Sequence, residues 1–167
     1  MKKILTVVTF LIIIISTISK VYSIEADIFV QSTVNRASEA LNNKFSKEEK
    51  IEKLKEIASE TVDIRGIGYY TLGAYRKNIS ENEINQYEML FEQYFLKSFS
   101  SRLAEYSNPE IEVVSKKKLN ENYTMVSSVL VGTEQRPEVK IDWRIYTKNA
   151  GNPLIRDLII EGLSLAR

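Results

Sequence analysis

The residue types that most often carry chemistry are scarce in this 167-residue chain. It contains no histidine and no cysteine, which removes most nucleophile–base pairs and most transition-metal sites. Gly66-Ile67-Gly68 is a bare G-x-G inside a helical stretch and follows no strand, so it does not indicate a phosphate-binding loop. Any catalysis would therefore depend on carboxylates.

Three carboxylates fall near the end of the chain. Asp142, Asp157 and Glu161 lie on the last two predicted strands and could form a pair for acid–base catalysis. We favour a simpler interpretation, in which Asp142 and Arg144 are neighbours on a solvated strand face, because residues two apart on a strand point to the same side. An α+β pocket enzyme that uses Asp142 or Glu161 as a base on a hydrophobic small molecule remains the alternative.

The N-terminal residues have the order of a secretory signal. Lys2 and Lys3 precede an apolar run over residues 4–15 that is too short for a comfortable membrane span, and Val21-Tyr22-Ser23 offers acceptable residues for cleavage. We predict a signal peptide over residues 1–23 and a single domain over 24–167. The remaining chain is weakly acidic, which disfavours nucleic acid as a partner. Lys116–Lys118 is interpreted as a solvated shoulder of a hairpin.

The first half of this domain has helical periodicity. Capping boxes at Ser46 and Ser80 predict two helix starts, and Asp63 predicts the start of a short helix that Gly73 ends. The longest predicted helix runs from Glu81 to about Tyr106. Its apolar stripe is strongly aromatic and consists of Ile84, Tyr87, Phe91, Phe95 and Phe99.

After Pro109 the apolar period changes to two, which is typical of strands. Four strands are predicted, at Glu110–Ser115, Tyr123–Val131, Val139–Thr147 and Leu154–Leu163. The connections are short and rich in turn-forming residues, so neighbouring strands should pair antiparallel. We therefore expect an α+β fold, with N-terminal helices packed on a twisted four-stranded antiparallel meander.

The apolar faces of these elements meet at one interface. Val139, Ile141, Trp143 and Ile145 share one face of the third strand, and Val129 belongs to the alternating pattern of the second. The last strand is apolar on both faces, with Ile155, Ile159 and Leu163 on one of them. The interface is either an ordinary filled core or a pocket that stays partly open around an apolar ligand.

Four stretches carry a resemblance to a known family. VDIRGIGYYTLG (62–73), FSSRLAEY (99–106), VKIDWR (139–144) and DLIIEGLSL (157–165) follow one another in the order of the MlaC family, also called the toluene-tolerance family. The resemblance covers most of the chain after residue 27. It implies a phospholipid-binding protein of the periplasm that takes part in maintaining outer-membrane lipid asymmetry.

The resemblance also implies a mechanism and partners. Lipid acyl chains would be held between helices and sheet, with no cofactor, no metal and no catalysis. The carrier would exchange lipid with an inner-membrane ABC transporter complex, which carries a membrane-anchored lipid-binding ring, and with an outer-membrane lipoprotein complex. The expected lipid contacts are Leu72, Tyr75, Phe91, Phe95, Phe99, Val129, Ile141, Trp143, Ile145, Ile159 and Leu163.

Overall fold

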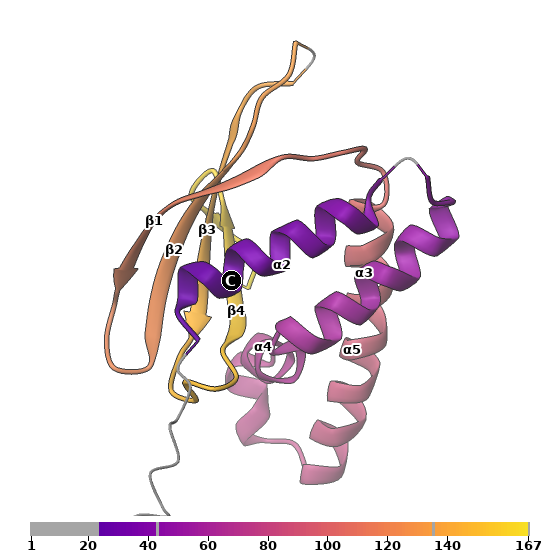
Figure 1. The fold of residues 1–167 in the computed structure, drawn as a ribbon. Coiled ribbons are helices and arrows are strands. Elements are labelled where there is room, and N and C mark those ends of the chain that lie inside the picture. Colours follow the sequence, from indigo (N-terminus) through magenta and orange to yellow (C-terminus); the bar gives the residue numbers. More distant parts are fainter. Residues whose placement is uncertain (1–23, 43, 135, 167) are drawn as a thin grey trace, which may run out of the picture.

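Helices cover one face of an antiparallel sheet in the computed structural model (Figure 1). The described residues are 24–42, 44–134 and 136–166, so the predicted signal peptide lies outside them. The helices are α2 (Ala26–Ala40), α3 (Lys47–Thr61), α4 (Ile64–Thr71), the 3-10 helix η1 (Gly73–Lys77) and α5 (Glu81–Leu103). The strands are β1 (Ile111–Lys118), β2 (Tyr123–Leu130), β3 (Val139–Tyr146), β4 (Leu154–Ile160) and β5 (Leu163–Ser164). None of the helices in the described part has the length and apolarity needed to cross a membrane.

The α+β class is confirmed, and the meander has five strands instead of four. The strands lie in the order β1-β2-β3-β4-β5, and each neighbouring pair is antiparallel. The extra strand, β5, comes from the last predicted strand, which a turn divides into two. The short connections seen in the sequence therefore give sequential pairing.

The predicted capping boxes begin α3 and α5. Ser46 accepts a hydrogen bond from the backbone N–H of Glu49 (3.2 Å), whose carboxylate accepts one from the N–H of Ser46 (2.8 Å). Ser80 and Glu83 make the same two bonds at 3.3 and 2.8 Å. The backbone N–H of Ser46 lowers the pKa of Glu49, and the hydroxyl of Ser80 lowers that of Glu83. At the start of both helices, the capping box thus provides hydrogen-bond acceptors for backbone N–H groups that would otherwise have no partner.

Contacts with β4 and with α5 hold the short helix α4 in place. Asp63 caps it by accepting from the backbone N–H of Gly66 (2.9 Å) and also pairs with Arg156 of β4. Gly68 lies directly against the ring of Phe91 on α5, where an added Cβ would come within 2.8 Å of Cδ1. A glycine at this position lets the two helices approach closely.

The register of β2 against β3 decides which residues face the helices. Ser128 is opposite Ile141, which shares a face with buried Trp143, whereas Val129 is opposite exposed Lys140. The prediction that Val129 faces the helices is therefore wrong. The pattern Ser127-Ser128-Val129 is weakly informative, because it places a serine on each face and alternation alone cannot decide between them.

A bulge in β4 changes its alternation. Asp157 pairs with Arg144 and Ile155 with Ile145, so Arg156 has no partner residue in the register. The extra residue places Ile155 and Leu158 on the same, helix-facing side of the sheet, and Ile159 on the opposite side. The predicted faces of this strand, with Ile155 and Ile159 together, are wrong for this reason.

The predicted last strand also ends early. Glu161 (φ 49°) and Gly162 (φ 82°) are both in the left-handed region, as a two-residue hairpin turn requires. The chain therefore reverses, and Leu163 returns opposite Ile160 with 74% of its surface exposed. The prediction that Leu163 continues the strand beside Ile159 is wrong.

Helix α2 is attached to the sheet along β1. Gln31 donates to the carbonyl of Ile111 (3.4 Å) and accepts from the N–H of Val113 (3.2 Å), so its side chain pairs with the strand edge. Lys116 donates to two carboxylates at the start of α2, those of Glu25 (2.6 Å) and Asp27 (2.9 Å); these contacts raise its own pKa and lower that of Asp27. The first lysine of the basic run is therefore bound within the domain.

Candidate functional site

An apolar cavity of about 200 Å³ lies between the helices and the sheet. We call it the inner cavity. Its helical wall includes Val34 and Ala37 of α2, Leu54 and Ala58 of α3, and Phe99 and Leu103 of α5. Its sheet wall includes Ile111, Leu130, Val139, Ile141, Trp143, Ile155, Leu158 and Ile160, with Leu165 beyond β5. Every strand from β1 to β4 contributes side chains to this wall.

The serine and threonine hydroxyl groups in the wall of the inner cavity are already satisfied. Thr33, Ser38 and Thr61 each donate to a backbone carbonyl, at 2.9, 2.8 and 2.7 Å. The indole N–H of Trp143 donates to Ser128 (2.7 Å), whose hydroxyl donates in turn to a backbone carbonyl of β3. The cavity surface is therefore chemically apolar and suits a hydrocarbon ligand.

The aromatic stripe of α5 leads into this cavity. Its rings stack in sequence from Tyr87 to Phe91 (5.9 Å between centroids), Phe95 (6.2 Å) and Phe99 (5.3 Å). Phe99 lines the inner cavity, and Phe95 joins it around a smaller space of about 40 Å³, which we call the side extension. The stripe therefore builds one end of the apolar region.

The structure brings together part of the predicted contact set. Phe99, Ile141 and Trp143 line the inner cavity, and Phe95 lines the side extension. Ile145 is fully buried in the core, and Phe91 packs against this core.

Five predicted contacts lie away from the inner cavity. Val129 and Ile159 lie on the opposite face of the sheet. Tyr75 and Leu163 are strongly exposed, and Leu72 ends α4. Sequence analysis in turn missed the helical wall from α2 and α3, although the apolar stripes that build it are visible as Val34, Leu54 and Ala58. Nothing in those stripes distinguishes residues that fill a core from residues that line a cavity.

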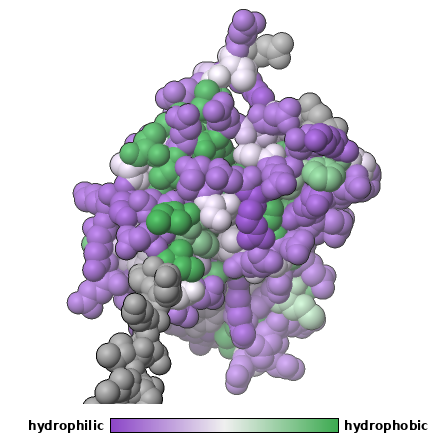
Figure 2. Space-filling model, in the orientation of Figure 1, coloured by the Kyte–Doolittle hydropathy of each residue, from purple (hydrophilic) through white to green (hydrophobic). Residues whose placement is uncertain are grey.

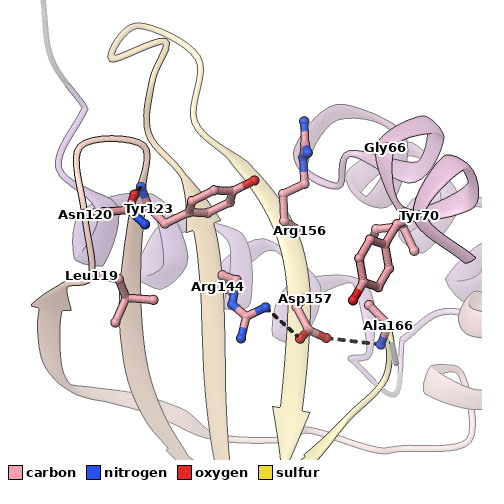
Figure 3. Close-up of a pocket in the computed structure, with 10 residues that line it drawn as sticks. Gly66, Tyr70, Leu119, Asn120, Tyr123, Arg144, Arg156, Asp157 and Ala166 are labelled. Atoms are coloured by element: carbon pink, nitrogen blue, oxygen red, sulfur yellow. Dashed lines mark hydrogen bonds and ion pairs between the residues drawn. The ribbon is translucent and has the colours of Figure 1, made fainter. Parts of the chain in front are cut away.

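A second depression lies on the opposite face of the sheet, at the edge near α4 (Figure 3). We call this space of about 350 Å³ the outer cleft. Figure 3 shows Arg144 and Ala166 on either side of Asp157. Asp157 is buried and accepts from Ser164 (2.8 Å) and from the N–H of Ala166 (3.2 Å), with Arg144 at 3.7 Å. This carboxylate is engaged in holding the C-terminal turn to the sheet.

The other candidate carboxylates also lie outside the inner cavity. Asp142 accepts from Ser127 (2.5 Å) on the opposite face of the sheet, and Glu161 accepts from the N–H of Lys140 (2.5 Å) in the exposed turn. Neither faces the apolar space in which a hydrophobic substrate would bind. The geometry therefore gives no support to the catalytic alternative.

Figure 2 shows a face of the molecule that is mostly hydrophilic, with scattered apolar patches. In the view of Figure 2 the apolar areas lie mainly over the half of the molecule that contains the sheet. The inner cavity is therefore a better candidate for binding an apolar ligand than the surface seen in this view.

A fold of this kind, with helices laid over a sheet wall and an apolar cavity between them, is typical of proteins that bind an apolar ligand. The chain belongs to the MlaC family: the family model described as "MlaC protein" matches residues 31–167. No curated protein sequence matches this chain.

The fold is similar to that of a solved protein from Ralstonia solanacearum. That protein is described as a phospholipid-binding protein in complex with a phospholipid, and it aligns with a TM-score of 0.69. The alignment covers 86% of this chain and 82% of the other, at 14% sequence identity. At this identity the likeness shows a shared fold.

Proposed function

We propose that this protein is a phospholipid carrier that holds acyl chains in the inner cavity. The observation that carries the proposal is the cavity wall, which is apolar on both sides and has its serine and threonine hydroxyls turned to backbone carbonyls. Membership of the MlaC family and the phospholipid bound by the structural neighbour support the same ligand class. The acyl-chain contacts that we propose are Phe95, Phe99, Ile141 and Trp143.

The carrier acts by removing an energetic barrier. Each buried CH₂ is worth about 0.8 kcal/mol, so one chain of roughly sixteen carbons costs on the order of 10 kcal/mol to expose to water. A lipid with two such chains cannot cross an aqueous gap quickly as a free molecule. An apolar cavity replaces the membrane interior during transit, and no bond is made or broken.

The cavity must widen to do this. Its volume of about 200 Å³ is below the roughly 300–1,000 Å³ of pockets that enclose a drug-sized ligand. Entry of acyl chains therefore requires the helical wall and the sheet wall to move apart. The contacts across the space are apolar, whereas the bonds of Gln31 to β1 and of Asp63 to Arg156 on β4 join the two walls at their edges.

The proposed route lies in the periplasm, after cleavage of residues 1–23. The family resemblance implies two exchange partners. One is an inner-membrane ABC transporter complex with its lipid-binding ring, and the other is an outer-membrane lipoprotein complex. Export should be visible in N-terminal sequencing of the mature protein, which we expect to start near Ile24.

Lipid extraction tests the ligand, and vesicle transfer tests the activity. Protein purified from its exported compartment should release phospholipid, and the protein should accelerate movement of a labelled phospholipid from donor to acceptor vesicles. The Trp143→Ala variant should carry less lipid because it removes the largest apolar surface that the sheet wall offers to an acyl chain. Protein that carries no phospholipid and transfers none would overturn the proposed function.

A further inference from the structure

A third depression adjoins the inner cavity at the end where β2 connects to β3. We call this space of about 230 Å³ the loop hollow. It lies between residues 106–110 and the β2–β3 connection. It shares Tyr106, Pro109, Leu130 and Val139 with the inner cavity. A molecule whose hydrocarbon fills the inner cavity can therefore place its polar end in the loop hollow.

The loop hollow contains a cation without a carboxylate partner. The guanidinium of Arg136 lies over the ring of Tyr106, 5.2 Å from its centroid. Among residues 24–42, 44–134 and 136–166, no carboxylate lies within 4.0 Å of it. Stacking on tyrosine orients the guanidinium while leaving its N–H donors available for an anion.

Backbone contacts join Arg136 and Gly132 to neighbouring chain segments. Thr133 and Arg136 exchange backbone hydrogen bonds of 2.8 and 3.2 Å. Gly132 packs so closely on the returning chain that an added Cβ would lie 2.8 Å from the backbone N of Glu138. A backbone that is already hydrogen-bonded at Arg136 lowers the conformational entropy lost when a ligand binds there.

Among the described residues, the opposite end of the apolar region has no arginine without a carboxylate partner. The side extension leads toward the outer cleft, with which it shares Ile67, Asp157 and Ala166. Both arginines there are paired, Arg144 with Asp157 and Arg156 with Asp63. A phosphate arriving at that end would compete with carboxylates already in place, which favours the loop hollow.

We propose that the loop hollow binds the phosphate of the carried phospholipid, and that Arg136 is its principal donor. The proposal rests on the proposed carrier function. Arginine matches phosphate oxygens in a two-pronged arrangement, and charge-assisted bonds of this kind are the stronger class of hydrogen bond. Glu110 lines the same hollow and adds one negative charge, so a zwitterionic headgroup fits better than one with a second negative charge.

The test compares two lipids with the same acyl chains, of which one lacks phosphate. Protein is loaded from mixed micelles that contain equal amounts of dioleoylphosphatidylcholine and dioleoylglycerol, and native mass spectrometry gives the ratio of the two bound lipids. The wild-type protein should select the phosphatidylcholine. Arg136→Gln should lower that ratio by about tenfold while binding of dioleoylglycerol alone stays unchanged, and Arg136→Lys should recover part of the selection.

Lys117→Gln is the matched control, because it also removes one positive charge but lies on β1 at the other end of the sheet, opposite Met125 near the start of β2. It should keep the wild-type ratio. An Arg136→Gln protein with the wild-type ratio, or a loss of equal size in Lys117→Gln, would overturn the phosphate site and leave the carrier function standing. A wild-type protein that takes up neither lipid would overturn both.

Discussion

A carboxylate placed in the inner cavity should abolish lipid binding. Leu158 lines both the inner cavity and the side extension, so Leu158→Glu puts a charge where acyl chains would lie. An unpaired buried charge costs several kcal/mol, and about 4 kcal/mol corresponds to roughly a thousandfold loss of affinity. Without lipid, water can enter and solvate the carboxylate. The folded state then loses mainly leucine burial, about 2 kcal/mol.

The assay is phospholipid per protein after extraction, with circular dichroism to confirm folding. Leu163→Glu is the matched control, since it makes the same change at a side chain that is 74% exposed, and it should keep wild-type lipid. Ala37→Glu repeats the test from α2, where glutamate is a good helix former. A folded Leu158→Glu protein that carries the wild-type amount of phospholipid would refute the placement of the acyl chains.

Three further predictions concern the frame around the cavity. Gly68→Ala should lower the free energy of unfolding in urea by about 1–3 kcal/mol, although alanine is the better helix former, because its Cβ would press on Phe91; if the loss persists in a Phe91→Leu background, this reason is wrong. Ser128→Ala should cost about 1–3 kcal/mol, because the indole N–H of Trp143 loses its acceptor; no loss in thermal or urea unfolding would show that the bond is dispensable. Glu83 has a pKa below its ordinary 4.5 in the folded protein, so it stabilises the fold above that pH and the contribution fades as pH falls through the folded value. The difference in melting temperature between wild type and Glu83→Gln should therefore shrink in acid, and a difference that grows there would contradict the sign.

Local signals in the sequence predicted the frame well. The two capping boxes and the cap at Asp63 begin helices as expected, because each depends on residues within one turn. The change of period after Pro109 located the meander, and the strand bounds differ by a few residues only, as with β1 (Ile111–Lys118). Such features need no knowledge of the rest of the fold.

The faces of the last strand needed information that the sequence pattern does not contain. A bulge at Arg156 shifts the alternation by one residue, and the turn at Glu161 and Gly162 reverses a chain whose residues are apolar before and after it. The apolar pattern of such a run is the same whether the strand continues or the chain turns back as a hairpin. Ile159 and Leu163 were therefore assigned to the wrong surroundings, whereas Trp143, on a strand without interruption, was assigned to the right face.

The division between core and cavity was also beyond the sequence. Ile141 and Ile145 are four residues apart on one strand face, with Trp143 between them on the same face, yet Ile145 is fully buried and Ile141 lines the cavity. Their difference comes from the helices laid over them, α2 and α3, whose distance from the sheet is a property of the assembled fold.

Fluorescence of Trp143 tests the central claim most directly, because it is the only tryptophan of the chain and it lies in the wall of the inner cavity. The protein would be loaded with phosphatidylcholine that carries bromine on its acyl chains, or with the unbrominated lipid, and native mass spectrometry would confirm one bound lipid in each case. Bromine quenches indole emission only near contact, so we expect strong quenching with the brominated acyl chains and none with the unbrominated lipid. Emission that stays unchanged while the brominated lipid is bound would mean that the acyl chains lie outside the inner cavity.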